Sequence, residues 1–233
     1  MTHRPAADLP FDPDGLTLTY QHHQSMGMDV FSETTERWTV TVRGPGEDLG
    51  DEDGPAVGEL RLYRMRTDAG ANWTMAADAE SGDLLSIIET VMDDGQFTEA
   101  FEEEIEAPYG ELLVLDLVRL DKPLRGFGLG PILAAEAVNR LEVGCCAVAA
   151  MPGASEPLSN ESTATDEDHD EVTRKIAALW ESIGFRAFAD GVHLRDVALD
   201  HRAVLTRCRA DLRELSKEYR AAAQGELVPA LHP

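Results

Sequence analysis

The chain has 233 residues, and its 44 acidic against 20 basic residues give a formal net charge of −24. This length suits one full hydrophobic core, so we expect one domain with extensions. The negative charge argues against nucleic acid and anionic membranes as partners and is compatible with cationic substrates.

The sequence predicts a cytoplasmic protein without a bound metal. No apolar run reaches the length of a membrane span or resembles a signal peptide. The three cysteines, two of them adjacent, form neither a disulfide framework nor a metal-ligand pattern. His3, His22 and His23 lack further ligands at a suitable spacing, so surface histidines are the favoured interpretation.

The first part of the chain predicts an irregular segment followed by antiparallel strands. Residues 1–14 are rich in Pro and Asp, and we expect them to be poorly ordered. Apolar residues alternate with threonine over 16–20, and alternation returns at 38–42 and 60–63. The acidic, turn-rich stretch 44–55 separates the last two segments, which therefore predict a hairpin with a long flexible tip.

Two helices are predicted before the centre of the chain. Leu84, Ile87, Ile88 and Val91 recur at the spacing of one helix face. A weaker pattern over 98–105 indicates a second, shorter helix. Both precede the next strand.

The stretch 111–141 joins a buried strand, a glycine-rich turn and a helix. Leu112–Leu120 is a short run rich in Leu and Val, as in a buried strand. The turn Arg125–Gly130 contains three glycines, and helical spacing follows from Pro131 to Leu141. Glycines let the backbone approach a ligand, and amides at a helix N-terminus attract anions. The turn is therefore a candidate phosphate-binding loop.

The C-terminal part predicts one strand, a hairpin and two helices. Cys145–Ala150 is a short apolar strand, and the polar, then acidic stretch 153–170 is a predicted mobile loop. A helix with apolar spacing from Val172 to Ile183 precedes a hairpin over 185–197. The helix His201–Ala223 carries an apolar stripe. We favour its packing onto its own domain, with a homodimer seam as the alternative. Residues 15–198 thus form the domain and 199–233 a helical extension.

Common nucleotide-binding motifs do not fit the glycine-rich turn. A dinucleotide fingerprint needs G-x-G-x-x-G, and the sixth position counted from Gly126 is Pro131. A nucleotide P-loop needs Gly-Lys-Ser/Thr, and this triplet does not follow. The turn does match Arg/Gln-x-x-Gly-x-Gly/Ala through Arg125, Gly128 and Gly130.

This pattern between a strand and a helix resembles the acyl-coenzyme A pyrophosphate loop of the GNAT acetyltransferase superfamily. Further along, Leu179-Trp180-Glu181-Ser182-Ile183-Gly184-Phe185 is similar to the family's Leu-Tyr-x-x-Leu-Gly-Phe segment. The resemblance covers Leu112 to Arg195. It implies an α/β (α+β) fold with a mixed, mostly antiparallel central sheet flanked by helices, to which this chain adds a C-terminal helix.

The resemblance also implies direct transfer of an acyl group from acetyl-coenzyme A to an amine of a small molecule or a protein. Backbone groups of Val118 and Leu120 would contact the pantetheine arm, and the turn would bind the pyrophosphate. Thr173 stands where an asparagine commonly contacts the cofactor. The implied cofactor-binding residues are Val118, Leu120, Arg125, Gly126, Phe127, Gly128, Leu129, Gly130 and Thr173.

Asp116 and Glu111 are the candidate catalytic bases. Asp116 is an acid inside the predicted strand, where burial would raise its pKa. An equally favoured alternative is a carboxylate paired with an arginine. Simple strand alternation places Asp116 on the same face of the strand as Leu112, Val114, Val118 and Leu120. Glu111, at the start of the predicted strand, is the second candidate. Cys145 and Cys146 are interpreted as buried small residues rather than nucleophiles.

Two functions stay open. The first is an N-acyltransferase, and the second is a catalytically inactive coenzyme A-binding or structural relative. Trp180 replaces the tyrosine that protonates the coenzyme A sulfur in the family, and an indole N–H has no useful acidity. Trp180 is therefore predicted to lie in the core or in a pocket wall. The early helices also follow the N-terminal strands, whereas the family places them between the first two.

Overall fold

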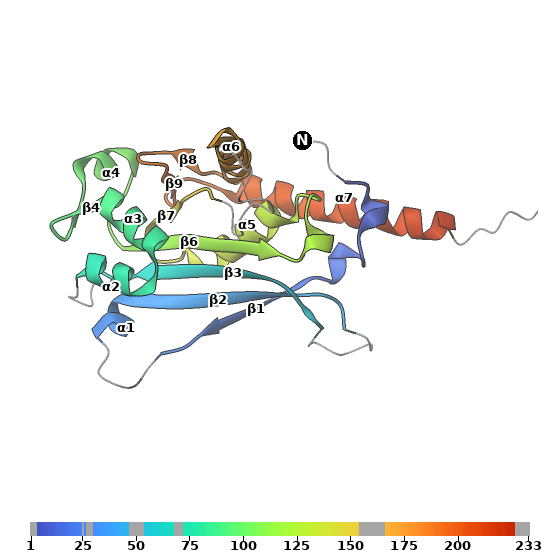
Figure 1. Cartoon of the computed structure of the whole chain (residues 1–233), viewed down its shortest axis with the longest axis horizontal. Coiled ribbons are helices and arrows are strands. Elements are labelled where there is room, and N and C mark those ends of the chain that lie inside the picture. The colour runs from blue at the N-terminus through green and yellow to red at the C-terminus, as the bar shows by residue number, and fades with distance from the viewer. Residues whose placement is uncertain are drawn as a thin grey trace, which may run out of the picture.

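A seven-stranded sheet forms the centre of the computed structural model, with helices on both of its faces (Figure 1). The structure describes residues 4–24, 26, 30–46, 54–67, 72–153 and 166–226. The tip of the predicted hairpin at 47–53, His3 and most of the predicted loop at 153–170 lie outside these residues.

The strands of the main sheet are antiparallel except for one parallel pair at its centre. The order is β1-β2-β3-β6-β7-β9-β8, and β6 and β7 are the parallel pair. The strands are β1 (Thr17–His22), β2 (Thr35–Arg43), β3 (Ala56–Met65), β6 (Glu111–Leu120), β7 (Cys145–Ala150), β8 (Arg186–Ala187) and β9 (His193–Asp196). A separate two-stranded hairpin consists of β4 (Met92–Asp93) and β5 (Gln96–Phe97). The predicted fold class, a mixed and mostly antiparallel sheet flanked by helices, is confirmed.

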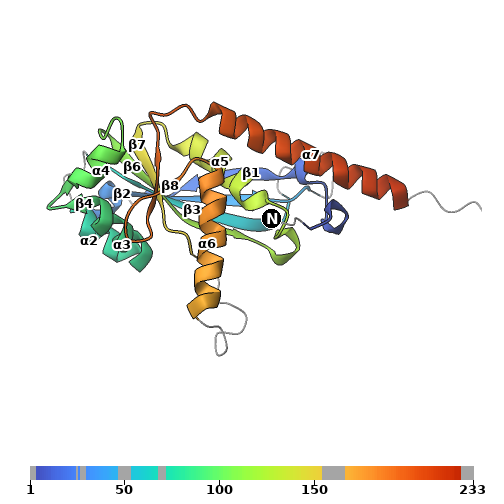
Figure 2. The same cartoon turned by 90° about the horizontal axis from the view of Figure 1, so that it is seen from above.

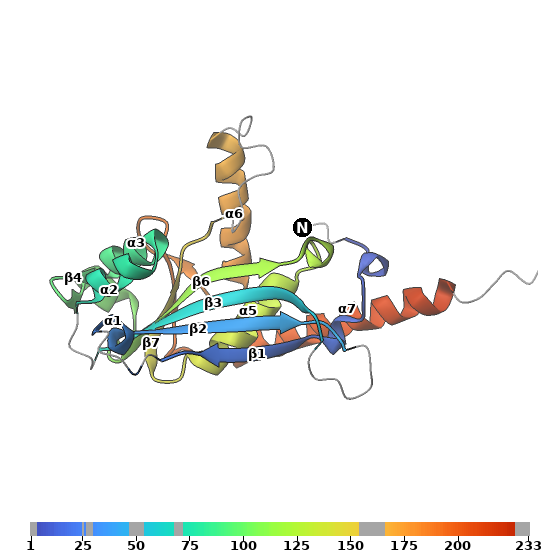
Figure 3. The same ribbon diagram turned by 60° about the horizontal axis from the view of Figure 1, so that its bottom comes forward.

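The helices divide between the two faces of the sheet. In Figure 3, α2 and α3 lie in front of one end of the sheet, and α5 lies behind it. The helices are α1 (Val30–Thr34), α2 (Trp73–Glu80), α3 (Gly82–Val91), α4 (Glu99–Glu104), α5 (Leu129–Leu141), α6 (Asp166–Ser182) and α7 (Arg202–Glu226). Three 3-10 helices are η1 (Ala6–Asp8), η2 (Pro13–Gly15) and η3 (Lys122–Leu124). None of the helices in the described ranges is long and apolar enough to cross a membrane.

Strand alternation builds two hydrophobic layers. Leu60, Leu62 and Leu113 point to the side of α5, while Met65 and Leu112 point to the side of α2 and α3. All five side chains are fully buried. Burial of each such side chain stabilises the fold by about 1.5–3 kcal/mol.

The predicted helices before β6 are present, and the structure adds another. α3 and α4 match the predicted spans and begin at the side-chain caps Ser81 and Thr98. α2 was not predicted because its buried face consists of Trp73 and two alanines, which give no apolar pattern. Its cap is Asn72, whose side chain accepts a hydrogen bond from the amide of Met75 at 3.1 Å.

The two ends of the described chain lie together. Residues 4–14, expected to be poorly ordered, include η1 and most of η2 and pack against α7. The apolar stripe of α7 joins the core on the α5 side through Leu205, Cys208 and Leu212. This contact agrees with the favoured interpretation that the C-terminal helix packs onto its own domain. Figure 2 shows α7 running beyond the edge of the sheet, past the N-terminal segment.

Candidate functional site

β6 and β7, at the centre of the sheet, are paired only along the first half of β6. Their parallel register runs from Glu111 opposite Cys145 to Leu115 opposite Ala150, where β7 ends. β6 continues alongside β3 to Leu120 and leads into the glycine-rich turn. Ligands of α/β sheets commonly bind beyond the carboxyl ends of parallel strands. The second half of β6, beyond the end of β7, lies at such a position.

A β-bulge in β6 lies just beyond the end of its pairing with β7. The β3–β6 register pairs Leu62 with Leu115 and Arg61 with Leu117, so Asp116 is the extra residue. One inserted residue reverses the faces of all later side chains. The bulge corrects the prediction that Val118 and Leu120 share a face with Asp116. Asp116 shares a face with Leu112 and Val114, whereas the later apolar residues of β6 switch sides: Val118 and Leu120 pack on the α5 side.

Asp116 is a buried carboxylate paired with an arginine. Its side chain is 2% exposed, and one oxygen (Oδ2) lies 2.6 Å from Nε of Arg61. The hydroxyl of Ser81 donates to the other oxygen (Oδ1) at 3.5 Å and also caps α3. The positive end of α3 further favours an anion there. The structure thus shows the arginine-paired carboxylate that the sequence left open as an alternative.

Arg61 and Tyr63 extend this polar group along β3. Burial alone would lower the pKa of Arg61, but its hydrogen bond to Asp116 raises it, so the cation persists. Burial raises the pKa of Tyr63 to about 12, so its hydroxyl stays protonated at neutral pH. Neither residue was singled out from the sequence, because only the strand register brings them near Asp116.

Glu111 lies at the opposite end of β6 from the glycine-rich turn. It forms ion pairs with Arg64 at 3.4 Å and Arg66 at 3.8 Å, and Arg66 also pairs with Glu36. At about 3.3 Å per strand residue, Glu111 is roughly 30 Å from Leu120. The structure therefore does not bring this second candidate base to the turn.

The glycine-rich turn exposes backbone amides at the start of α5. Gly126 and Gly128 have φ angles of +87° and +78°, which glycine adopts without strain. Gly128 is the N-cap of α5, and Pro131 lies in the first turn. Across the described ranges, no hydrogen bond uses the amides of Gly128, Leu129 or Gly130 as donors. The amides at this helix N-terminus are therefore available to an anion.

The side chains of the turn anchor it to the protein. Arg125 folds back, and its Nε donates to the carbonyl oxygen of Leu120 at 2.6 Å. Phe127 is 4% exposed and Leu129 is 1% exposed, and both belong to the core on the α5 side. These two residues can contact a ligand through backbone groups, since their side chains are occupied by packing.

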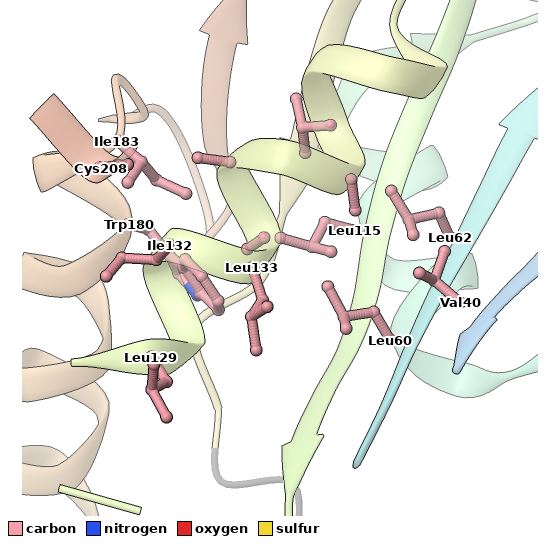
Figure 4. Packing of buried hydrophobic residues seen from close by; sticks show 14 of the residues in the cluster. Val40, Leu60, Leu62, Leu115, Leu129, Ile132, Leu133, Trp180, Ile183 and Cys208 are labelled. Carbon is pink, nitrogen blue, oxygen red and sulfur yellow. The ribbon is translucent and has the colours of Figure 1, made fainter. Parts of the chain in front are cut away.

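Trp180 of the second predicted motif is buried, whereas Thr173, earlier on α6, is exposed. Trp180 is 9% exposed and packs in the core on the α5 side, close to Ile132 and Cys208 (Figure 4). Its predicted position in the core is confirmed. Thr173 is exposed, about two helical turns earlier on α6. Its hydroxyl makes no hydrogen bond to other described residues, and Figure 2 shows the first part of α6 projecting from the body.

The adjacent cysteines of β7 are buried on opposite faces of the sheet. Cys145 belongs to the layer on the α5 side and Cys146 to the other layer. Burial raises their pKa values to about 12 and about 11, so both stay neutral thiols at physiological pH. The interpretation as buried small residues is confirmed.

Two surface hollows lie elsewhere on the molecule. One of about 450 Å³ lies between the end of α5 and the start of α7, and one of about 490 Å³ lies between α2 and the β4–β5 hairpin. His22 stacks on Trp38 with ring centres 5.1 Å apart. Within the described residues, no three or more His, Cys, Asp or Glu side chains are grouped to hold a metal ion.

No protein family model matches this chain, and no curated protein is similar to it in sequence.

Proposed function

We propose that this chain is an acyl-coenzyme A-dependent N-acyltransferase of the GNAT type, which transfers an acyl group, most simply acetyl, to an amine of a small molecule or a protein. The observation that carries the proposal is the combination at the end of β6. β6 continues past the end of its parallel neighbour β7 and leads through a glycine-rich turn into the N-terminus of α5.

This combination suits the two chemical parts of coenzyme A. Its diphosphate would accept hydrogen bonds from the amides of Gly128, Leu129 and Gly130, each worth roughly 1.5–3 kcal/mol when charge-assisted. Its pantetheine arm carries amide groups, which would pair with the backbone of β6 near Val118 and Leu120. Thr173 is a weaker candidate, since it is exposed on a projecting helix.

The arrangement of the sheet supports the same proposal. The order β1-β2-β3-β6-β7-β9-β8 has its one parallel pair at the proposed cofactor site. A short helix, α1, lies between β1 and β2, where the family has its early helices. The other early helices of this chain, α2, α3 and α4, follow β3 instead. The helices on the acceptor side therefore come from a different part of the chain than in the family.

The reaction needs little from the protein beyond positioning. The amine nitrogen attacks the acyl carbon, the carbon–sulfur bond breaks, and the proton lost by nitrogen ends on sulfur. Holding the reactants together accounts for roughly 7–11 kcal/mol of the barrier. Asp116, at the bulge just beyond the end of the β6–β7 pairing, is the candidate to receive the acceptor's ammonium group and its proton. We leave Glu111 out of this role, because Arg64 and Arg66 hold it at the far end of β6.

A catalytically inactive coenzyme A-binding protein is the second candidate. Two observations favour it. Trp180 is packed in the core and its indole is no acid. Arg61 already pairs with one oxygen of Asp116 and Ser81 donates to the other, so an acceptor amine would have to compete with these partners.

Thermal unfolding with acetyl-coenzyme A tests the proposal. At a concentration of 100 times Kd, binding stabilises the native state by about 2.7 kcal/mol, which raises Tm by roughly 5–10 °C. Gly128→Glu should abolish the shift, because it places a negative side chain in the turn. Gly225→Glu, with the same charge change at an open site near the end of α7, should retain it.

A thiol-release assay over a panel of amines then separates the two candidates. Release with any amine establishes the transferase, and binding without release with every amine class establishes the inactive binder. A wild-type protein without a thermal shift would overturn both.

A further inference from the structure

The N-terminal segment of the chain lies over the glycine-rich turn. The amide of Arg4 donates to the carbonyl oxygen of Gly126 at 3.1 Å. The Arg4 guanidinium lies over the ring of Phe127, with its central carbon 4.8 Å from the ring centre. A side chain at position 126 would have its Cβ 3.0 Å from Cδ of Arg4.

The segment is fixed in this position by α7. Leu9 is 5% exposed and belongs to the core on the α5 side. Asp12 accepts hydrogen bonds from Ser216, at 2.5 Å, and from Arg220. Burial alone would raise the pKa of Asp12, but these two hydrogen bonds lower it below its ordinary value. The contacts anchor the residues that follow Arg4, so its guanidinium stays near the turn.

The guanidinium of Arg4 is held loosely enough to take another partner. It donates to the carbonyl oxygen of Arg125 at 3.4 Å and pairs with Asp8 at 3.6 Å, both long contacts. Its side chain is 45% exposed. An arginine stacked on an aromatic ring keeps its N–H groups at the edge of the guanidinium plane, where they can bind a phosphate. Stacking on Phe127 also reduces the rotamer freedom lost on binding.

The negative net charge of the chain makes positive charges at the proposed binding site important. With a formal net charge of −24, the protein repels an anionic ligand at long range unless cations stand at the binding site. The turn itself follows Lys122 and contains Arg125. Arg4 adds a third positive charge from a distant part of the sequence.

We infer that Arg4 is a phosphate-binding residue of the coenzyme A site and that residues 4–15 form part of that site. The inference rests on the proposed function, since it assigns a further residue to the same ligand. The alternative is that Arg4 only covers Phe127 as a structural contact.

Calorimetric titration of the full chain with coenzyme A distinguishes these roles. Arg4→Met keeps the apolar stem over Phe127 and removes the charge. It should weaken binding about tenfold, which corresponds to the lower end of the energy range for a charge-assisted hydrogen bond, because Arg4 is half-exposed. Arg4→Lys retains the charge and should recover most of the affinity. Arg202→Met, which removes a 93%-exposed arginine beyond the other end of α5, is the matched control and should bind like the wild type.

A second titration with 3′-dephospho-coenzyme A identifies the phosphate. A loss that persists assigns Arg4 to the diphosphate, and a loss seen only with coenzyme A assigns it to the 3′-phosphate. Both support the inference. Equal affinities for Arg4→Met and Arg202→Met, with unchanged Tm in the absence of ligand, would overturn it and leave the proposed function intact. No heat from the wild type would overturn both.

Discussion

Replacing Arg61 with leucine tests whether Asp116 is held as a buried anion at the bulge of β6. Breaking a buried ion pair from one side costs about 3–5 kcal/mol, because a charge is left without its partner. The cost should be smaller here, since Arg61 is 28% exposed and Ser81 still donates to the carboxylate. We expect Arg61→Leu to lower the free energy of unfolding by about 2–3 kcal/mol in urea at pH 7, and Tm by roughly 5–10 °C.

Two further variants make this test specific. Arg119→Leu removes an ion pair from the same pair of strands, but the arginine is 50% exposed and lies 3.8 Å from Glu59. Such surface pairs contribute about 0–1 kcal/mol. The double variant Arg61→Leu/Asp116→Leu removes both charges and should regain most of the lost stability. If Arg61→Leu costs no more than Arg119→Leu, Asp116 is not a buried anion and its assignment as the acceptor-facing carboxylate falls.

Two more predictions concern backbone and thiol chemistry. Gly128→Ala should lower stability by about 1–2 kcal/mol, because φ is +78°, whereas Gly82→Ala, with no atom near its Cβ, should change it little. Equal losses in thermal unfolding would contradict the geometry of the turn. The raised pKa values of Cys145 and Cys146 stabilise the native state fully below the unfolded thiol pKa of about 8.5, and this contribution is lost as pH rises toward 11. Stability from pH 9 to 11 should therefore fall more steeply in the wild type than in a Cys145→Ala/Cys146→Ala variant, and parallel slopes would refute the reasoning.

Local patterns were sufficient for most of the fold. The Leu- and Val-rich run of β6, the turn and the helix after it were predicted because strand and helix periods and glycine positions are local properties. α2 was missed because alanines bury little area and leave no amphipathic pattern. The order around residues 4–15 was missed for a different reason. Their Pro- and Asp-rich sequence has few apolar residues, and their position depends on α7 at the other end of the chain.

The candidate site was less predictable, because its contacts join distant segments. The sequence suggested an arginine as a partner of Asp116 but not which arginine, because Arg61 reaches Asp116 only through the β3–β6 register. The bulge itself has no sequence signal here, and it moved Val118 and Leu120 to the other face. Arg4 and Arg125 are 121 positions apart, and no local pattern connects them.

The distribution of charge shows how an acidic chain can serve an anionic ligand. At physiological ionic strength, screening weakens the field of exposed carboxylates beyond about 8 Å, while contacts at a binding site are screened much less. Under the proposed function, the cations near the turn therefore decide the affinity for coenzyme A. The remaining negative surface acts on the other reactant, since it attracts a cationic amine during encounter. The net charge of −24 and the binding of a diphosphate are thus compatible, provided that Arg4 and Arg125 stay beside the turn.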